Sequence, residues 1–296
     1  MSDEIANLYK LQYADGLSLV AQQLTSSLRG ACTPVDMAGE AKAFADFMGT
    51  VRLQKKQGRN TDTPIVGAEF KRRWIHSDRY IGGDYVDEVD KLKTLVDPTN
   101  TYTQAFAAAA ARAYDRSFVE GVLGTNYVGE KGTTQVTLPA AQVVGDGTGL
   151  LTFDRLKEGV KKLKQKHAIQ PGDTVHLAWN AHHEDKFINS TEVKSSDFTT
   201  KRVIDMGGVD EFYRVQMHLL EDEDESDEGR MLPLTGTKRS LILWVPRYVN
   251  EGIRQDTFGD VSWDHKKRSY YVDGGIDVGH SRAQEVGVVR IDVLES

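Results

Sequence analysis

The sequence lacks the features that mark secreted and membrane-spanning proteins. Its single cysteine, Cys32, excludes both an intramolecular disulfide and a cysteine-based zinc site, and it suits a reducing cytoplasm. No segment approaches the ~18 consecutive apolar residues of a membrane span. The first residues, MSDEIANLYK, have neither the basic start nor the apolar core of a signal peptide. We therefore expect a soluble protein that is made in the cytosol.

Basic residues are also in the minority, with 37 Lys and Arg against 44 Asp and Glu and a formal net charge of −7. A protein whose main work is to grip phosphates normally carries a basic excess, so dedicated nucleic-acid binding is disfavoured. The charge does not prevent the protein from lying close to packed DNA. The 296 residues suffice for one large domain or two smaller ones, and 39% apolar residues are typical of a globular protein.

The first fifty residues predict two short helices, at 5–28 and 38–48, separated by GACTP at 30–34. Apolar residues in the first helix are spaced three and four apart, which is typical of one buried stripe. These residues are Leu17, Val20, Ala21, Leu24 and Leu28. Little else nearby in the sequence could complete a core, so we expect an arm that packs on some other surface.

Residues 51–75 alternate apolar and polar positions, and Gly58 and Asn60 lie where a turn would fall. This pattern predicts a long, exposed two-stranded hairpin. Its basic residues are Arg52, Lys55, Lys56, Arg59, Lys71, Arg72 and Arg73. An isolated hairpin is marginally stable in water, so we expect it to dock on a neighbour. The alternative is a solvated basic hairpin on a monomer.

The clearest element is a helix at 98–123, for which Asp97 is a suitable N-cap, Pro98 a suitable first residue and Gly124 a stop. A helix of this length would extend about 39 Å. One face carries the predicted packing residues Tyr102, Phe106, Ala109, Ala110 and Ala113, and Arg112 and Asp115 are predicted to pair on the surface. The alanines allow a sheet or loop to cross the helix closely.

Later segments mix both element types. A helix at 153–167 is predicted with Thr152 or Asp154 as its cap, and strands are predicted at 174–179, 213–219, 240–245 and 261–263. The last forty residues also have the pattern of a sheet. Since helices and strands alternate without a regular βαβ repeat, the fold class is predicted to be α+β.

Three motifs partly resemble ligand-binding sites, but none has the full pattern of such a site. GDGTG at 145–149 precedes a helix but lacks the Lys-Ser/Thr of a phosphate-binding loop, so we interpret it as a turn. His176, His182 and His183 cluster near acids, yet adjacent histidines do not have the i, i+4 spacing of a zinc-binding helix, and Asn180 as a helix cap explains the string.

The run EDEDESDE at 221–228 predicts a solvated loop. Weak cation binding at a subunit junction and docking on a basic patch of a partner remain alternatives. No motif predicts a catalytic residue, a cofactor-binding residue or a metal ligand.

Two segments carry a resemblance to a known family. DPTNTYTQAFAAAAARAYDRSFVEGVLG (97–124) resembles the spine segment of tailed-phage major capsid proteins of the Hong Kong 97 type, where an Ala-rich helix carries Arg-x-x-Asp, here Arg112 and Asp115. GHSRAQEVGVVRIDVL (279–294) resembles the closing strand of the same family, with Gly279, Arg282 and Glu285 before the run at 288–291. The order of elements along nearly the whole chain is similar as well.

The resemblance implies an α+β fold of the Hong Kong 97 type in five parts. These are an N-terminal arm at 1–50, an E-loop hairpin at 51–82, a P-domain at 83–145 with the spine helix 98–123, an A-domain at 146–257 and returning strands at 258–296. The candidate contacts with a neighbouring subunit lie in the hairpin. They are Arg59, Lys71, Arg72, Arg73 and Trp74.

The function that the resemblance implies is structural rather than enzymatic. Copies of the chain would form hexamers and pentamers of an icosahedral head that encloses double-stranded DNA, assembled in the host bacterial cytoplasm. Scaffolding, portal and decoration proteins are the further partners implied. Lys55, Lys56 and Lys71 could serve a subunit crosslink, but no asparagine follows Asn250, so we expect none. The rivals are an encapsulin-like compartment shell, a tail or connector protein, and a metal-dependent hydrolase built on the histidine cluster.

Overall fold

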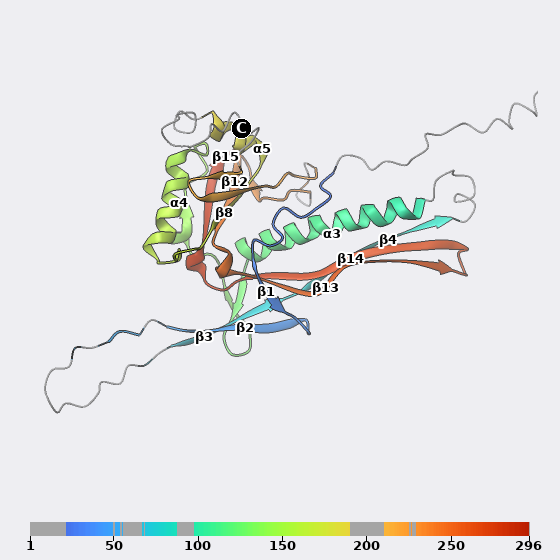
Figure 1. Cartoon of the computed structure of the whole chain (residues 1–296), viewed down its shortest axis with the longest axis horizontal. Coiled ribbons are helices and arrows are strands. Elements are labelled where there is room, and N and C mark those ends of the chain that lie inside the picture. Colours follow the sequence, from blue (N-terminus) through green and yellow to red (C-terminus); the bar gives the residue numbers. More distant parts are fainter. Residues whose placement is uncertain are drawn as a thin grey trace, which may run out of the picture. The chain divides into compact units, whose positions relative to one another are not determined.

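The computed structural model describes residues 22–49, 51–53, 55, 67, 69–87, 98–189, 210–224, 226 and 229–295 (Figure 1). They divide into two compact units. The first takes its described residues from Met1–Ser26, Arg79–Ala113 and Gln255–Ile276. The second takes them from Ser27–Asp78, Tyr114–Arg254 and Asp277–Ser296. Within the described residues, no helix is both long and apolar enough to cross a membrane.

Three α-helices lie in the described part of the chain: α3 (Pro98–Leu123), α4 (Phe153–Gln165) and α5 (Ala181–Ile188). Short 3₁₀ turns are η1 (Ala140–Gln142), η3 (Pro246–Tyr248) and η4 (Glu285–Gly287). The strands of the first half are β1 (Thr33–Asp36), β2 (Ala41–Met48), β3 (Phe70–His76), β4 (Asp78–Asp87), β5 (Asn126–Val128), β6 (Thr134–Val136) and β7 (Val143–Val144). Those of the second half are β8 (Val175–Trp179), β9 (Glu211–Phe212), β10 (Val215–Leu219), β11 (Leu234–Thr235), β12 (Lys238–Trp244), β13 (Val249–Asp264), β14 (Ser269–Arg282) and β15 (Val288–Leu294).

The largest sheet belongs to the second unit and has the order β7-β15-β12-β8-β10-β9, with β11 beside β12. Both faces of its central strands are covered, since all five residues of β8 and all of β12 except Lys238 are buried. Helix α4 lies along this sheet (Figure 1). Gly159 of α4 permits the close approach, since a Cβ there would lie 2.8 Å from Leu243 of β12. The caps are as predicted, with Thr152 before α4 and Asn180 before α5.

A second sheet, β2-β3-β5-β6, contains the hairpin and corrects the predicted N-terminal region. Residues 41–48, expected within a helix, form β2 and pair antiparallel with β3. The alanines of AKAFADFM favour a helix locally, but pairing with β3 outweighs that weak preference. Residues 22–28 are not helical either, and the remainder of the helix expected at 5–28 lies outside the described residues.

Helix α3 has the predicted bounds, Pro98–Leu123, and the N–H of Gly124 closes its last turn on the carbonyl of Glu120 at 2.8 Å. In the first unit, glycines of β4 and β14 make room for the helix. A Cβ at Gly274 would lie 2.8 Å from Phe106, and one at Gly82 would lie 3.2 Å from the same ring. The predicted close crossing of a sheet over this helix is therefore confirmed.

The third sheet has the order β1-β13-β14-β4. Strand β13 has 16 residues and β14 has 14, so the short strand expected at 261–263 is only the end of a long ribbon. In the second unit, β1 pairs in parallel with the start of β13, from Thr33 opposite Asn250 to Asp36 opposite Ile253. This pairing fixes the segment that precedes β1 beside the sheet.

Candidate subunit interface

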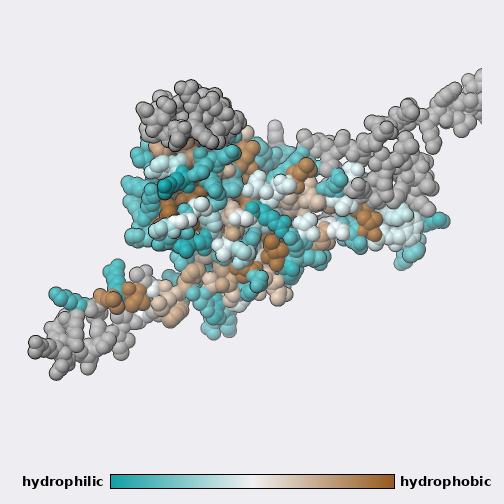
Figure 2. All heavy atoms as spheres, viewed as in Figure 1, coloured by the Kyte–Doolittle hydropathy of each residue, from teal (hydrophilic) through white to brown (hydrophobic). Residues whose placement is uncertain are grey.

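The last residue of β2, the described residues that follow it and the first residue of β3 expose a group of large apolar side chains. Met48 is 60% exposed, Val51 41%, Leu53 94% and Phe70 74%. We call these four residues the hairpin-end patch. Figure 2 shows hydrophobic side chains gathered on this part of the face, next to hydrophilic ones. Single exposed apolar residues are common on monomers, whereas several that gather at one projecting end mark a surface that binds another protein.

Two of the predicted basic contact residues lie on the surface of the hairpin. Lys71 is exposed. Arg72 donates to both carboxylate oxygens of Asp46 across the β2–β3 pair, at 2.7 and 2.9 Å, and these hydrogen bonds hold the pKa of Asp46 below its usual value. Because both side chains are largely exposed, the pair adds little stability. Arg59 lies outside the described residues.

Arg73 is the predicted contact residue that the structure contradicts. It is 6% exposed, and its guanidinium donates to both oxygens of Glu285 at 2.6 and 2.8 Å. Burial raises the pKa of Glu285 and the hydrogen bonds from Arg73 lower it, with a net lowering. The pair joins β3 to η4 within one chain, so Arg73 is not available to a neighbouring subunit. Trp74 beside it is half-buried and donates from Nε1 to the carbonyl of Gly129 at 2.8 Å.

The segment at 279–294, which resembles the closing strand of the capsid family, makes two further close contacts within the chain. Arg282 is fully buried at the C-terminal end of α3, where it donates to the carbonyls of Val122 and Gly124. A cation at this end of a helix is favourable, while burial lowers the pKa of Arg282 to about 10. Gly279 lies so close to the preceding strands that a Cβ there would be 1.7 Å from the carbonyl oxygen of His76.

The predicted packing residues of α3 divide between partly and fully buried positions. Ala110 is buried, whereas Phe106, Ala109 and Ala113 are half-buried. Sequence reasoning missed Tyr114 and Phe118, which form a more deeply buried row with Val122, although the i, i+4 spacing of this row is visible in the sequence.

Arg112 and Asp115 do not form the predicted surface pair. Arg112 donates to the side chain of Gln22 and the carbonyl of Gln23 in the first unit. Asp115 is fully buried and accepts from the backbone N–H groups of Ser27 and Leu28 in the second unit. Each residue thus anchors part of the N-terminal segment.

The acidic run is an irregular loop that is exposed over most of its described part, as the sequence predicted, and it also makes internal contacts. Glu221, Glu223, Asp224 and Ser226 are exposed, and Asp222 is half-buried. Glu221 accepts from the N–H of Ala181 at the start of α5, Asp222 pairs with the buried Arg239 at 2.7 Å, and Glu223 pairs with Arg116 at 3.1 Å. Residues 225, 227 and 228 lie outside the described part of the chain.

The histidine cluster does not assemble a metal centre. His176 Nδ1 lies 2.8 Å from Nε2 of His218, whose Nδ1 in turn lies 2.8 Å from the carbonyl of Ser27. Burial and the neighbouring His218 lower the pKa of His176 to about 4. His183 instead hydrogen-bonds the side chain of Asn180. Within the described residues, neither His176, His182 nor His183 belongs to a group of three or more candidate ligands.

The glycine-rich segment at 145–149 is a turn, as its sequence suggested. Gly145 and Gly147 have φ values of 79° and 85°, which favour glycine. Arg155 of α4 donates to the carbonyl of Gly149 at 2.8 Å, and Thr148 donates from its backbone N–H to Asp146 at 3.0 Å. The turn is thereby fixed to α4.

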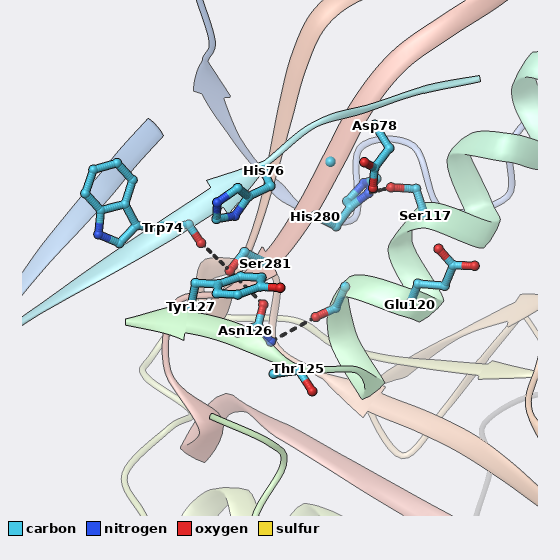
Figure 3. A pocket seen from close by; sticks show the side chains of 12 residues that line it. Trp74, His76, Asp78, Ser117, Glu120, Thr125, Asn126, Tyr127, His280 and Ser281 are labelled. Carbon is cyan, nitrogen blue, oxygen red and sulfur yellow. Dashed lines mark hydrogen bonds between the residues drawn. The ribbon is translucent and has the colours of Figure 1, made fainter. Parts of the chain in front are cut away.

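A cavity of about 180 Å³ lies in the second unit between β3, β14 and the end of α3 (Figure 3). Ser281 donates to Asn126 Oδ1 at 2.8 Å and to the carbonyl of Trp74 at 3.1 Å. His280 and Ser117 also line the cavity, with Nδ1 and Oγ 3.0 Å apart.

Comparison with known proteins decides between the alternatives. Residues 5–295 match the model of a family described as phage capsid protein. The chain belongs to this family. Its function is therefore structural, as a major capsid protein, and neither the encapsulin-like shell nor the hydrolase is favoured. A search of curated proteins returns no match.

Solved capsid structures share the fold of this phage capsid protein over nearly its whole length. The capsid protein of cyanophage P-SCSP1u is 13% identical with a TM-score of 0.71, covering 99% of this chain and 95% of that chain. The protein of Mycobacterium phage Che8 is 14% identical with a TM-score of 0.67 and coverages of 95% and 96%. That of Mycobacterium phage Bobi is 13% identical with a TM-score of 0.67 and coverages of 100% and 99%. The predicted α+β fold of the Hong Kong 97 type is confirmed.

Proposed function

We propose that this capsid protein assembles into hexamers and pentamers of an icosahedral head that encloses double-stranded DNA. The supporting observation is the hairpin-end patch, Met48, Val51, Leu53 and Phe70, which no other described part of the chain covers. Exposed apolar surface at the end of a projecting hairpin gains most when it is buried on a second copy. The role is structural, and no catalytic activity or cofactor is part of it.

The parts of the chain then have the following roles. The N-terminal arm ends near residue 40 rather than 50, because β2 belongs to the E-loop hairpin. The P-domain occupies 83–145, the A-domain 146–257, and the strands at 258–296 return to complete both. The basic residues Lys71 and Arg72 remain interface candidates together with Arg59, and the net acidic chain supplies complementary charge for them.

The resulting particle is the capsid of a virion, and its assembly takes place in the host bacterial cytoplasm. The portal, scaffolding and decoration proteins are further partners in this proposal. DNA is enclosed without sequence-specific contacts, since the net charge of −7 gives no excess of phosphate-binding groups.

Negative-stain electron microscopy of the purified full chain tests the proposal. Closed shells, or uniform sixfold and fivefold rings, are expected in the void volume of a size-exclusion column. A monodisperse monomer or dimer across a range of salt and crowder concentrations would contradict it. Single rings or open tubes would instead favour a connector or tail protein.

A further inference from the structure

Three residues from distant parts of the sequence meet beneath α3 in the second unit. Cys32 immediately precedes β1, Glu251 lies in β13 and His280 lies in β14, three neighbouring strands of one sheet. The Cys32 sulfur, a carboxylate oxygen of Glu251 and a ring nitrogen of His280 all lie within 4.8 Å of one another. The residues are 7%, 8% and 6% exposed. No motif in the sequence connects them, since 219 positions separate Cys32 from Glu251 (251 − 32).

Tyr114 of α3 closes this cluster from above. Its hydroxyl donates to Oε2 of Glu251, and its ring meets the ring of His280 edge to face with centroids 4.8 Å apart. Tyr114 is itself 1% exposed. The cluster is thus walled by a helix on one side and a sheet on the other.

The cluster contains one buried polar atom without a hydrogen-bond partner and one buried carboxylate without an ion-pair partner among the described residues. His280 directs Nδ1 to the Ser117 hydroxyl at 3.0 Å, while its Nε2 is buried without a hydrogen-bond partner. Glu251 receives one side-chain hydrogen bond, from Tyr114, and makes no ion pair within the described part of the chain. A buried imidazole nitrogen and a buried carboxylate are both costly when left in this state. A cation bound between them would satisfy both groups.

We propose that Cys32, Glu251 and His280 bind one divalent transition-metal ion, with zinc the best match. A thiolate, a carboxylate oxygen and a neutral imidazole nitrogen are the three ligand types of zinc, and the soft thiolate selects against magnesium and calcium. The two negative ligands balance the charge of the ion. The ligand atoms must approach one another by about 1 Å to reach zinc bonds of roughly 2.0–2.3 Å. One coordination position stays open for a water molecule or the Tyr114 oxygen.

The site would act as a structural clasp. It joins the segment that precedes β1 to β13 and β14, and so fixes the N-terminal segment on the sheet. His280 also lines the cavity of Figure 3, which offers a route of entry for the ion. The sequence prediction excluded a cysteine-based zinc site because one cysteine cannot supply several thiolates. A mixed ligand set needs only one thiolate, so this proposal departs from that prediction.

Cobalt substitution tests the proposal cleanly because the chain holds a single thiol. The full-length protein is unfolded in denaturant in the presence of a chelator, which removes any bound metal. It is then refolded with Co²⁺ and examined for a thiolate-to-cobalt charge-transfer band. We expect the band in the unmodified chain, its loss in Cys32→Ser, and its loss or clear shift in His280→Gln. His265→Gln, a change at an exposed histidine, is the matched control and should keep the band.

Elemental analysis gives an independent measurement on protein from zinc-supplemented cells. About one zinc ion per chain should pass through gel filtration with the unmodified protein, and none with Cys32→Ser. The proposal is overturned if refolded protein with a fully reduced thiol binds neither zinc nor cobalt, or if Cys32→Ser retains the full zinc content. Should Cys32→Ser fail to fold, the cobalt spectrum of the unmodified chain decides alone. Shell assembly is measured separately, so failure of the metal site leaves the capsid role intact.

Discussion

The side chain of Leu53 offers the sharpest test of how the capsid protein recognises its own copies. It is 94% exposed in the single chain, so replacing it with serine removes almost no internal contact. The stability of the unassembled chain should change by less than about 0.5 kcal/mol. In an assembled shell the same side chain is predicted to be buried on a neighbouring subunit.

The expected effect on assembly follows from that burial. Fully burying a leucine contributes about 1.5–3 kcal/mol, and every 1.4 kcal/mol corresponds to tenfold in an equilibrium constant. If Leu53 is buried in this way, Leu53→Ser should weaken the subunit contact that it makes by roughly 10- to 100-fold. The critical concentration for shell formation should rise by a similar factor.

Light scattering during assembly measures this concentration, and urea unfolding of the dissociated chain measures its stability. Leu150→Ser is the matched control, since Leu150 is 39% exposed but lies outside the hairpin. The reasoning is refuted if Leu53→Ser assembles at the same concentration as the unmodified chain. It is also refuted if the loss of assembly is fully explained by a loss of stability in the single chain.

Three further predictions concern stability, each measured by urea unfolding of the dissociated chain. Arg73→Met leaves Glu285 half-buried without its partner and should lower the free energy of unfolding by about 3–5 kcal/mol. Combining Arg73→Met with Glu285→Leu should recover most of this loss. Additive losses from the two changes would contradict the pairing. Gly279→Ala places a Cβ 1.7 Å from a backbone oxygen and should cost several kcal/mol, whereas an unchanged midpoint would contradict this packing. Burial lowers the pKa of His176 from 6.5 to about 4. As the pH falls, the unfolded chain therefore binds a proton at this residue before the folded chain does. Burial of neutral His176 contributes at most roughly 3 kcal/mol to the free energy of unfolding. This contribution is complete above pH 6.5 and is lost as the pH falls towards 4. His176→Gln should flatten that dependence, and an identical pH profile would refute the assignment.

Local signals in the sequence were sufficient for the elements whose ends are marked by caps. The bounds of α3 follow from Pro98 and Gly124, and Thr152 and Asn180 begin α4 and α5 as expected. Strand β2 could not be found in this way because its alanines favour a helix, and only pairing with residues 70–76 makes it a strand. Tertiary contact outweighs propensity at such positions.

The exposure and the contacts of individual side chains were harder to predict than the helices and strands. The basic run drew attention to Arg73, yet its side chain is buried while those of its neighbours Arg72 and Trp74 in the same strand are only half-buried. Nothing local to 221–223 reveals that its acids meet Arg239, Arg116 and the start of α5, because those partners are distant in sequence. The cluster of Cys32, Glu251 and His280 was hidden for the same reason.

A cryo-electron microscopy reconstruction of particles assembled from the full chain tests the central claim most directly. The account predicts a closed shell of sixfold and fivefold rings in which Met48, Leu53 and Phe70 of one subunit are buried on another. A shell whose hairpin ends project freely into solvent, or an assembly without fivefold rings, would contradict it.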